Sequence, residues 1–184
     1  MTWTRNQLFW IGLLLITGTA CGQDTVIRAQ PTPQKPIAER PTWTSPVPFT
    51  GERQLTHQDL TRTYQLHIPA KLPENAALVI AMHGYTGNAE GLMGYSGLNA
   101  MADQHGFVVA YPQGTKDGSG NPFFNVGYAF HDDSTVDDMG FLRELVESLQ
   151  EEYSLSSSDV FATGMSNGGD MSYLLACTSA DLFR

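Results

Sequence analysis

The stretch VFATGMSNGGDMSYLLAC, residues Val160 to Cys177, decides the fold. A strand is predicted over residues 159–163 and a helix from residue 166 onward, where apolar residues recur at helical spacing. Between them lies a G-x-S-x-G pattern centred on Ser166, in which a sharp strand-to-helix turn exposes a serine hydroxyl and glycines avoid side-chain clashes. An ordinary glycine-rich turn with a helix-capping serine is the alternative. The flanking strand and helix favour Ser166 as a nucleophile.

Upstream of this turn, strands and helices alternate. The run AALVIAM at 76–82 is apolar throughout, as expected of a central strand covered on both faces. The order is strand, strand, helix, strand, helix, strand, helix, which implies a largely parallel sheet flanked by helices, an α/β fold. Besides those already given, the predicted segments are strands over 61–68 and 107–111 and helices over 96–104 and 136–153.

Two helix starts and one long loop are also predicted. Ser96 is expected to cap the 96–104 helix, and Thr135 with Asp138 resembles a capping box before the 136–153 helix. The loop 112–135 is long enough to be functional. Its aromatic residues either line an acyl or aromatic pocket or anchor the loop to the core, and they are Phe123, Phe124, Tyr128 and Phe130. Its acidic residues and His131 are interpreted as helix caps and a solvated loop rather than a metal site.

A serine nucleophile needs a base for its proton and hydrogen-bond donors for the oxyanion. One expected donor is the backbone N–H of Asn167, which follows the serine and begins a helix whose dipole favours negative charge. The other is expected from the loop HGYTGNAEG, with Tyr85 as first choice and Gly84 or Thr86 as alternatives. His83 is expected to brace this loop rather than act as base, because the acid and the histidine follow the serine along the chain in such sites.

Four segments of the chain together resemble one family. They are AMHGYTGNAEG, LNAMADQHGFVVAYPQGT, VDDMGFLRELVESL and VFATGMSNGGDMSYLLAC. In this order they are similar to the polyhydroxybutyrate depolymerase and feruloyl esterase-like branch of the α/β-hydrolases, over residues 58–184. The resemblance implies a three-layer α/β-hydrolase fold with a mostly parallel sheet, and a serine esterase that works without a cofactor or a metal.

The resemblance also assigns roles to residues. It implies Ser166 as nucleophile, with an oxyanion hole formed by the Gly84–Tyr85 loop and Asn167. Asn125 in FFNVG falls where relatives often have a Trp-Asn pair, and is expected to support the loop. Phe124 replaces the Trp here, and the cysteine of a disulfide found in some relatives is absent from this loop.

The sequence departs from the family pattern after the nucleophile. The residues after Ser166 include Asp170 and Asp181 but no histidine, and all five histidines precede Ser166. The resemblance therefore implies that the catalytic acid, the histidine and the last strands lie beyond residue 184, so that the fold is incomplete and the 184-residue chain inactive. Alternatives are a peptidase or lipase on the same fold, or a non-catalytic tethered lipoprotein.

The N-terminal region has the features of an export signal. Residues 1–21 contain Arg5, an apolar run and small residues before Cys21, a pattern typical of a signal peptide. Two outcomes stay open: lipidation of Cys21, which would give a bacterial periplasmic or outer-membrane lipoprotein, and cleavage before it, which would give a secreted protein. Residues 22–57 are rich in Pro, Thr and Gln and are expected to form a disordered tether to the domain at 58–184.

The net charge of the chain limits the classes of partner that it is expected to bind. Lys and Arg number 10 against 19 Asp and Glu, a formal net charge of −9. Such a chain repels nucleic acid and anionic lipid, so membrane contact is expected only through a lipid on Cys21. Neutral small-molecule or polymeric esters are the expected substrates. Cys177, the other cysteine, is expected to be a small apolar residue in a helix.

Overall fold

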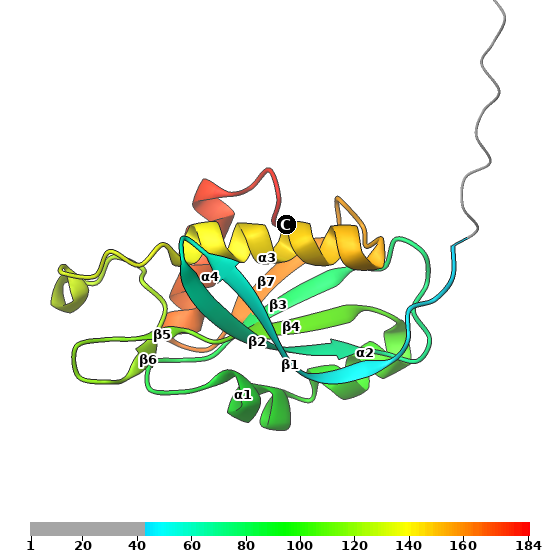
Figure 1. The fold of residues 1–184 in the computed structure, drawn as a ribbon, viewed down its shortest axis with the longest axis horizontal. Coiled ribbons are helices and arrows are strands. Elements are labelled where there is room, and N and C mark those ends of the chain that lie inside the picture. Colours follow the sequence, from blue (N-terminus) through cyan, green and yellow to red (C-terminus); the bar gives the residue numbers. More distant parts are fainter. Residues whose placement is uncertain (1–42) are drawn as a thin grey trace, which may run out of the picture. The chain divides into compact units, whose positions relative to one another are not determined.

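The computed structural model describes residues 43–184, in which one central sheet has helices on both faces (Figure 1). In Figure 1, α1 and α2 lie on one side of the sheet, and α3 and α4 lie on the other. The elements in chain order are β1 (Phe49–His57), β2 (Leu60–Ile68), β3 (Leu78–Met82), α1 (Ala89–Ser96), α2 (Leu98–His105), β4 (Val108–Pro112), β5 (Thr115–Lys116), β6 (Pro122–Phe123), the short 3-10 helix η1 (Ala129–His131), α3 (Asp138–Tyr153), β7 (Val160–Gly164) and α4 (Asn167–Thr178).

The sheet has five strands in the order β1-β2-β4-β3-β7. β4, β3 and β7 pair in parallel, as the alternation of strands and helices predicted, whereas β1 and β2 join by antiparallel pairing. The sheet of the described residues is therefore mixed. Met82 at the end of β3 pairs with Gly164 at the end of β7, so the loop after β3 and the turn after β7 meet at one edge of the sheet. This edge is where open α/β sheets bind their ligands.

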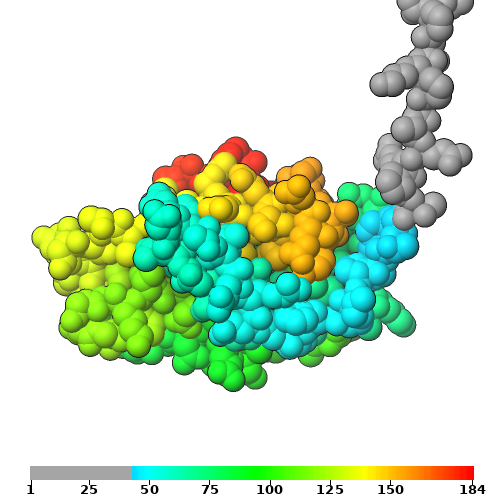
Figure 2. Space-filling model, in the orientation of Figure 1, coloured from blue at the N-terminus to red at the C-terminus, as the bar shows by residue number. Residues whose placement is uncertain are grey.

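The strand β1 corrects the predicted extent of the tether. The sequence was interpreted as disordered through residue 57, but Phe49–His57 pairs along its whole length with β2. Its residues alternate between half-buried and exposed, and Phe49 and Leu55 pack against the core. Arg53 lies over the Phe49 ring, 4.6 Å from its centroid. Polar residues between the few apolar ones hid a strand that needs only one face buried. Figure 2 shows β1 lying next to α3 on the surface.

Two apolar layers hold the helices to the sheet. The larger joins the sheet to α3 and α4 and includes Leu66, Ile80, Leu145 and Met171. The smaller lies on the other face, where Ala81, Val109 and Tyr111 of the sheet pack with Ala89, Leu92 and Ala102 of α1 and α2. The run at 76–82 has helices over both of its faces, as its uniform apolarity predicted, although Ala77 and Val79 are only half-buried.

The starts of two helices differ from the sequence prediction. Ser96 is the last residue of α1, and Gly97, with a φ of 73°, is the N-cap of α2. Ser96 Oγ still accepts the Leu98 amide at the start of α2, at 3.3 Å. Helix α1 is not among the predicted helices. Its N-cap is Asn88, whose Oδ1 accepts the Gly91 amide at 2.7 Å. The cap of α3 is Asp137, which accepts the Gly140 amide at 2.8 Å, and not the predicted pair of Thr135 and Asp138. The carboxylate of Asp138 is thereby available for another contact.

Within residues 43–184, β7 is an outer strand that pairs only with β3. One face of β7 packs on the larger apolar layer, while Phe161 on its other face is 40% exposed and Met165, directly after the strand, is 53% exposed. Beside them lies a shallow depression of about 270 Å³ whose apolar lining includes Leu92, Tyr95 and Leu98. In this part of the chain, none of the helices has both the length and the apolar character needed to cross a membrane.

Candidate active site

Ser166 occupies the sharp turn between β7 and α4. Its backbone has φ 51° and ψ −119°, a conformation that non-glycine residues rarely adopt. The residue is exposed, and its carbonyl accepts the Asp170 amide at 2.9 Å as the first bond of the helix. Strain of this kind costs about 1–3 kcal/mol and is concentrated at functional sites. The turn therefore has the backbone expected of a nucleophile elbow.

Glycines are required on both sides of this turn. A Cβ on Gly168 would lie 2.3 Å from the Met82 carbonyl oxygen and 2.6 Å from that of His83. A Cβ on Gly164 would lie 2.3 Å from the carbonyl carbon of Gly168. The first turn of α4 can therefore lie directly against the ends of β3 and β7 only because Gly168 and Gly164 lack side chains.

Asn167 is the first residue of α4, so its amide is one of the N-terminal groups that have no partner within the helix. Its side chain is buried and clamps the backbone of Phe124. The Oδ1 atom accepts the Phe124 amide at 2.7 Å, and Nδ2 donates to the Phe124 carbonyl at 2.9 Å. These two bonds fix Asn167 at the turn and hold the loop before α3 against it.

The loop after β3 lies against Ser166. A Cβ built on Gly84 would be 3.5 Å from the Ser166 Cβ and 3.2 Å from the Met165 carbonyl oxygen. The Gly84 carbonyl accepts from His83 Nδ1 at 2.8 Å. Carbonyl and amide of a trans peptide point in opposite directions, so the Tyr85 N–H points away from His83. The third candidate donor, the Thr86 amide, is already bonded to the Pro122 carbonyl at 2.9 Å.

His83 is buried, and each of its two ring nitrogens forms a hydrogen bond. The Gly114 amide donates to Nε2 at 3.0 Å, so Nε2 is unprotonated and Nδ1 carries the hydrogen that binds the Gly84 carbonyl. The Gln113 side-chain amide also lies 3.1 Å from Nε2. Burial lowers the pKa of His83, and this effect outweighs the hydrogen bond to Gly84 and the charge of Asp138. A neutral ring whose lone pair is already engaged is suited to hold the loop and not to take a proton.

Asn125 connects the loop to the start of α3. Its Nδ2 donates to the carbonyls of Ser134 and Val136, at 3.2 and 3.1 Å. Its own amide donates to Asp138 Oδ2 at 2.7 Å, and Asp138 Oδ1 accepts from Arg62 Nη2 at 2.5 Å. Burial raises the pKa of Asp138, while Arg62 and the Asn125 amide counteract it.

Arg62 and Asp138 are not among the site residues predicted from the sequence. A signal for Arg62 existed, because it is in phase with Tyr64, Leu66 and Ile68, the residues on the buried face of β2. A charge at such a position must find a buried partner. For Asp138 the sequence carried a misleading signal, since its place near a helix start suggested a cap.

Comparison with known proteins agrees with this geometry. The family described as Esterase PHB depolymerase matches residues 62–184. The chain belongs to this family. Poly(3-hydroxyalkanoate) depolymerase C of Paucimonas lemoignei is 32% identical over 120 residues, which are 64% of this chain and 28% of the relative. Feruloyl esterase B of Talaromyces funiculosus is 29% identical over 118 residues, 64% of this chain and 33% of the relative.

Among solved structures, the acetyl xylan esterase from Aspergillus awamori matches with a TM-score of 0.60 and 26% identity. The match covers 72% of this chain and 49% of that enzyme. The described residues therefore form part of an α/β-hydrolase fold, as the sequence predicted. The chain spans less than half of the length of each of these three relatives.

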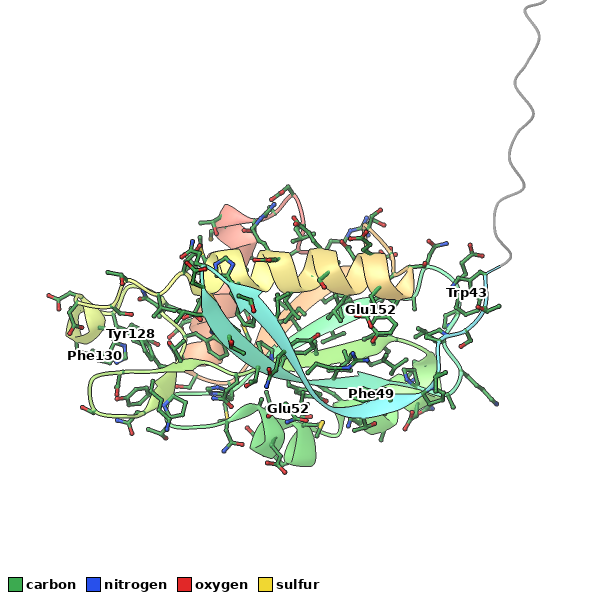
Figure 3. The ribbon with its side chains drawn as sticks, in the orientation of Figure 1. Trp43, Phe49, Glu52, Tyr128, Phe130 and Glu152 are labelled. Atoms are coloured by element: carbon green, nitrogen blue, oxygen red, sulfur yellow. The ribbon has the colours of Figure 1, made fainter. Side chains whose placement is uncertain are left out.

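In this member of the esterase family, the aromatic residues of the loop divide into two groups. Phe123 and Phe124 are fully buried and anchor the loop to the core, whereas Phe130 is 68% exposed. Tyr128 is half-buried, stacks on Phe130 with ring centroids 5.0 Å apart, and donates to the Asp170 carboxylate of α4. Figure 3 shows Tyr128 and Phe130 together on a projecting part of the loop before α3, residues 128–131, which is called the aromatic lobe below.

Asp117 attaches the Tyr85 side chain to this lobe. Its Oδ2 accepts from the Tyr85 hydroxyl at 2.5 Å and from His131 Nε2 at 3.2 Å, and its Oδ1 accepts the amides of Ser119 and Asn121. The hydrogen bond from Tyr85 is the main cause that lowers the pKa of Asp117 well below its usual range. Tyr85 thus connects the loop after β3 to the exposed aromatic lobe. Cys21 lies outside the described residues. Cys177 lies in helix α4, as predicted, but it is exposed and not part of the apolar core.

Proposed function

We propose that the complete gene product is a serine esterase that hydrolyses carboxylic esters through an acyl-enzyme on Ser166. The observation that carries this proposal is the exposed Ser166, with its positive φ of 51°, next to two amides of fixed direction, those of Tyr85 and Asn167. Membership of an esterase family supports the same reaction class.

In the proposed reaction, Ser166 Oγ forms a bond to the ester carbonyl carbon, and the carbonyl oxygen becomes an oxyanion. The Tyr85 and Asn167 amides donate hydrogen bonds to it, and the positive end of the α4 dipole adds to this stabilisation. Collapse of the intermediate breaks the bond to the alcohol, which leaves with the serine proton delivered by a base. Water then releases the acid by the same steps.

We place the base and its acid partner in the part of the gene product beyond residue 184. His83 donates and accepts at its two nitrogens and serves the loop. None of the other four histidines, all within residues 43–184, is hydrogen-bonded to the Ser166 hydroxyl. His57, His67 and His131 pair with Glu144, Asp103 and Asp117, and His105 ends α2. The family order of serine, acid and histidine supports this placement.

Polyhydroxyalkanoate-type polyesters and feruloyl or acetyl esters of polysaccharide are the proposed substrates, since related proteins carry those names. We further propose export of the protein, with residues 1–21 as signal peptide and either lipidation of Cys21 or release. Incorporation of labelled palmitate into the wild type but not into Cys21→Ser would distinguish the lipoprotein from a secreted form.

The test is hydrolysis of p-nitrophenyl acetate by the complete gene product and by its Ser166→Ala variant. Loss of at least about 1,000-fold in kcat is expected, because alanine at this position removes the hydroxyl that is proposed to form the acyl-enzyme. Cys177→Ser, a change of an exposed side chain on the same helix, is the matched control and should keep wild-type activity. Full activity of Ser166→Ala would refute the assignment of the nucleophile.

A further inference from the structure

An ion pair lies deep in the domain, between β2 and the start of α3. Arg62 and Asp138 are 3% and 1% exposed, and Arg62 Nη2 lies 2.5 Å from Asp138 Oδ1. The guanidinium also lies over the Phe141 ring, 4.0 Å from its centroid. Its other terminal nitrogen, Nη1, has no hydrogen-bond partner among the residues that the structure describes. A buried pair of this kind is seldom more stable than well-packed apolar residues of similar size, so stability alone does not explain it.

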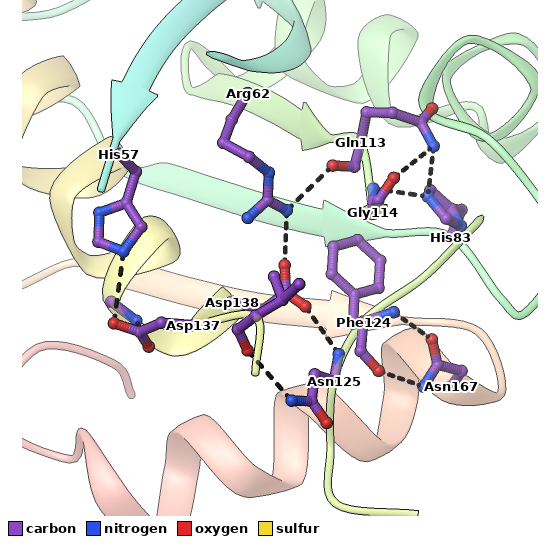
Figure 4. A network of polar contacts seen from close by, with 12 residues as sticks. His57, Arg62, His83, Gln113, Gly114, Phe124, Asn125, Asp137, Asp138 and Asn167 are labelled. Carbon is purple, nitrogen blue, oxygen red and sulfur yellow. Dashed lines mark hydrogen bonds and ion pairs between the residues drawn. The ribbon is translucent and has the colours of Figure 1, made fainter. Parts of the chain in front are cut away.

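Each partner of the pair holds a different loop. Arg62 Nη2 donates to the Gln113 carbonyl at 3.3 Å, and the next residue, Gly114, donates its amide to His83. Asp138 Oδ2 accepts the amide of Asn125, directly after Phe124. These two series of hydrogen bonds are called the Gln113 branch and the Asn125 branch below, and Figure 4 shows the Arg62–Asp138 pair between them.

Each branch ends at one of the two amides of the site. The Gln113 branch continues through His83 to the Gly84 carbonyl, which sets the direction of the Tyr85 amide. The Asn125 branch continues through the Phe124 backbone to the Asn167 side chain. The two branches also touch each other, since the rings of His83 and Phe124 lie 4.8 Å apart between centroids.

We propose that Arg62 and Asp138 are positioning residues that set both oxyanion donors from one buried point. This inference rests on the proposed function. The pair does not touch the substrate and changes no bond. It fixes two loops, one bonded through His83 and the other through Asn167, so that the two amides beside Ser166 keep the spacing needed by a tetrahedral intermediate. Catalysis is sensitive to such spacing, because a shift of about 1 Å can cost about 100-fold in rate.

The experiment replaces the pair in the complete gene product by apolar residues of similar size, Arg62→Met with Asp138→Leu, so that no lone charge stays buried. With active sites titrated, kcat for p-nitrophenyl acetate should fall by about 10- to 100-fold, while KM should change less than about 2-fold. Affinity for an arylboronic acid, which forms a tetrahedral adduct on the serine, should fall by a similar factor. A merely structural pair would lower the fraction of active protein but leave these per-site values unchanged.

The control replaces the exposed pair Arg143 and Asp181, 2.8 Å apart, by the same two residues, and should leave kcat within about 2-fold. If the double variant at 62 and 138 does not fold, Arg62→Lys decides. Lysine keeps the charge but cannot reproduce the planar fork, so kcat should fall by about 3- to 10-fold. Wild-type kcat and boronate affinity in a folded variant would overturn the inference. The activity of Ser166→Ala is measured in parallel. If this variant keeps its activity, the proposed function fails. If it loses its activity, the results for the variants at 62 and 138 test the positioning pair alone.

Discussion

The contact between the first turn of α4 and the end of β3 gives a sharp prediction for Gly168→Ala. The added Cβ would lie 2.3 Å from the Met82 carbonyl oxygen, whereas ordinary contact begins at 3.4 Å. Helix α4 and strand β3 must therefore separate by about 1 Å. The Cβ would meet the carbonyl oxygens of Met82 and His83, and these backbone atoms cannot rotate away as a side chain could. Overpacking of this kind costs about 1–3 kcal/mol, and we expect the upper end of that range.

The same shift moves Asn167, the neighbour of Gly168, away from its place beside Ser166. We expect a loss of about 100-fold in kcat, a factor typical of a 1 Å misplacement. Urea unfolding of the complete gene product measures the free energy, and p-nitrophenyl acetate hydrolysis measures the activity. Gly94→Ala is the matched control: a Cβ there meets nothing within 4 Å, so the variant should be as stable as the wild type or more stable by about 0.5–1 kcal/mol. A Gly168→Ala protein with wild-type stability and activity would refute the close-contact reasoning.

Three other predictions follow from single residues. Ser166→Gly should be about 1 kcal/mol more stable to urea than Ser166→Ala, because only glycine relieves the strain at φ 51°; equal stability would contradict the strain. The pKa of His83 lies below its ordinary 6.5, so stability present above pH 6.5 should be lost as the pH falls through the lowered pKa. Urea midpoints from pH 7.5 to 5 should decline more for the wild type than for His83→Gln, and parallel curves would contradict this. The Phe130 ring is 68% exposed, so Phe130→Ala should change the free energy of unfolding by less than about 0.5 kcal/mol. The same variant should have a higher KM for a hydroxycinnamate ester and an unchanged KM for an acetate. An equal effect on both esters would show that the ring does not select the acyl group.

The parallel part of the fold could be predicted from the sequence because each of its elements has a strong local signal. The strand at 76–82 is apolar throughout, and α3 has apolar residues at helical spacing. The G-x-S-x-G turn also predicted the position of Ser166 between a strand and a helix, as the structure has it. Such signals lie within a few residues, so no tertiary contact is needed to interpret them.

What could not be predicted depends on partners far along the chain. β1 has few apolar residues and is fixed by its pairing with β2. Helix α1 contains Gly91 and Gly94, which weaken its helical pattern. The partnership of Arg62 with Asp138 joins residues 76 positions apart, and no spacing rule announces it. The choice among Gly84, Tyr85 and Thr86 likewise required the bond between Thr86 and Pro122.

The outer position of β7 has a practical consequence for anyone who expresses residues 43–184 alone. The strand that delivers the nucleophile has a free edge, on which the Val160 carbonyl accepts the Arg184 amide at 2.9 Å and the groups after it are not paired with another strand of the described residues; Phe161 and Met165 lie beside this edge. Such a border attracts another strand, from a second molecule if nothing nearer is present. Recombinant preparations of this segment should accordingly form oligomers or inclusion bodies at high concentration, and a lysine at Phe161 would be the first change to try for a monodisperse sample.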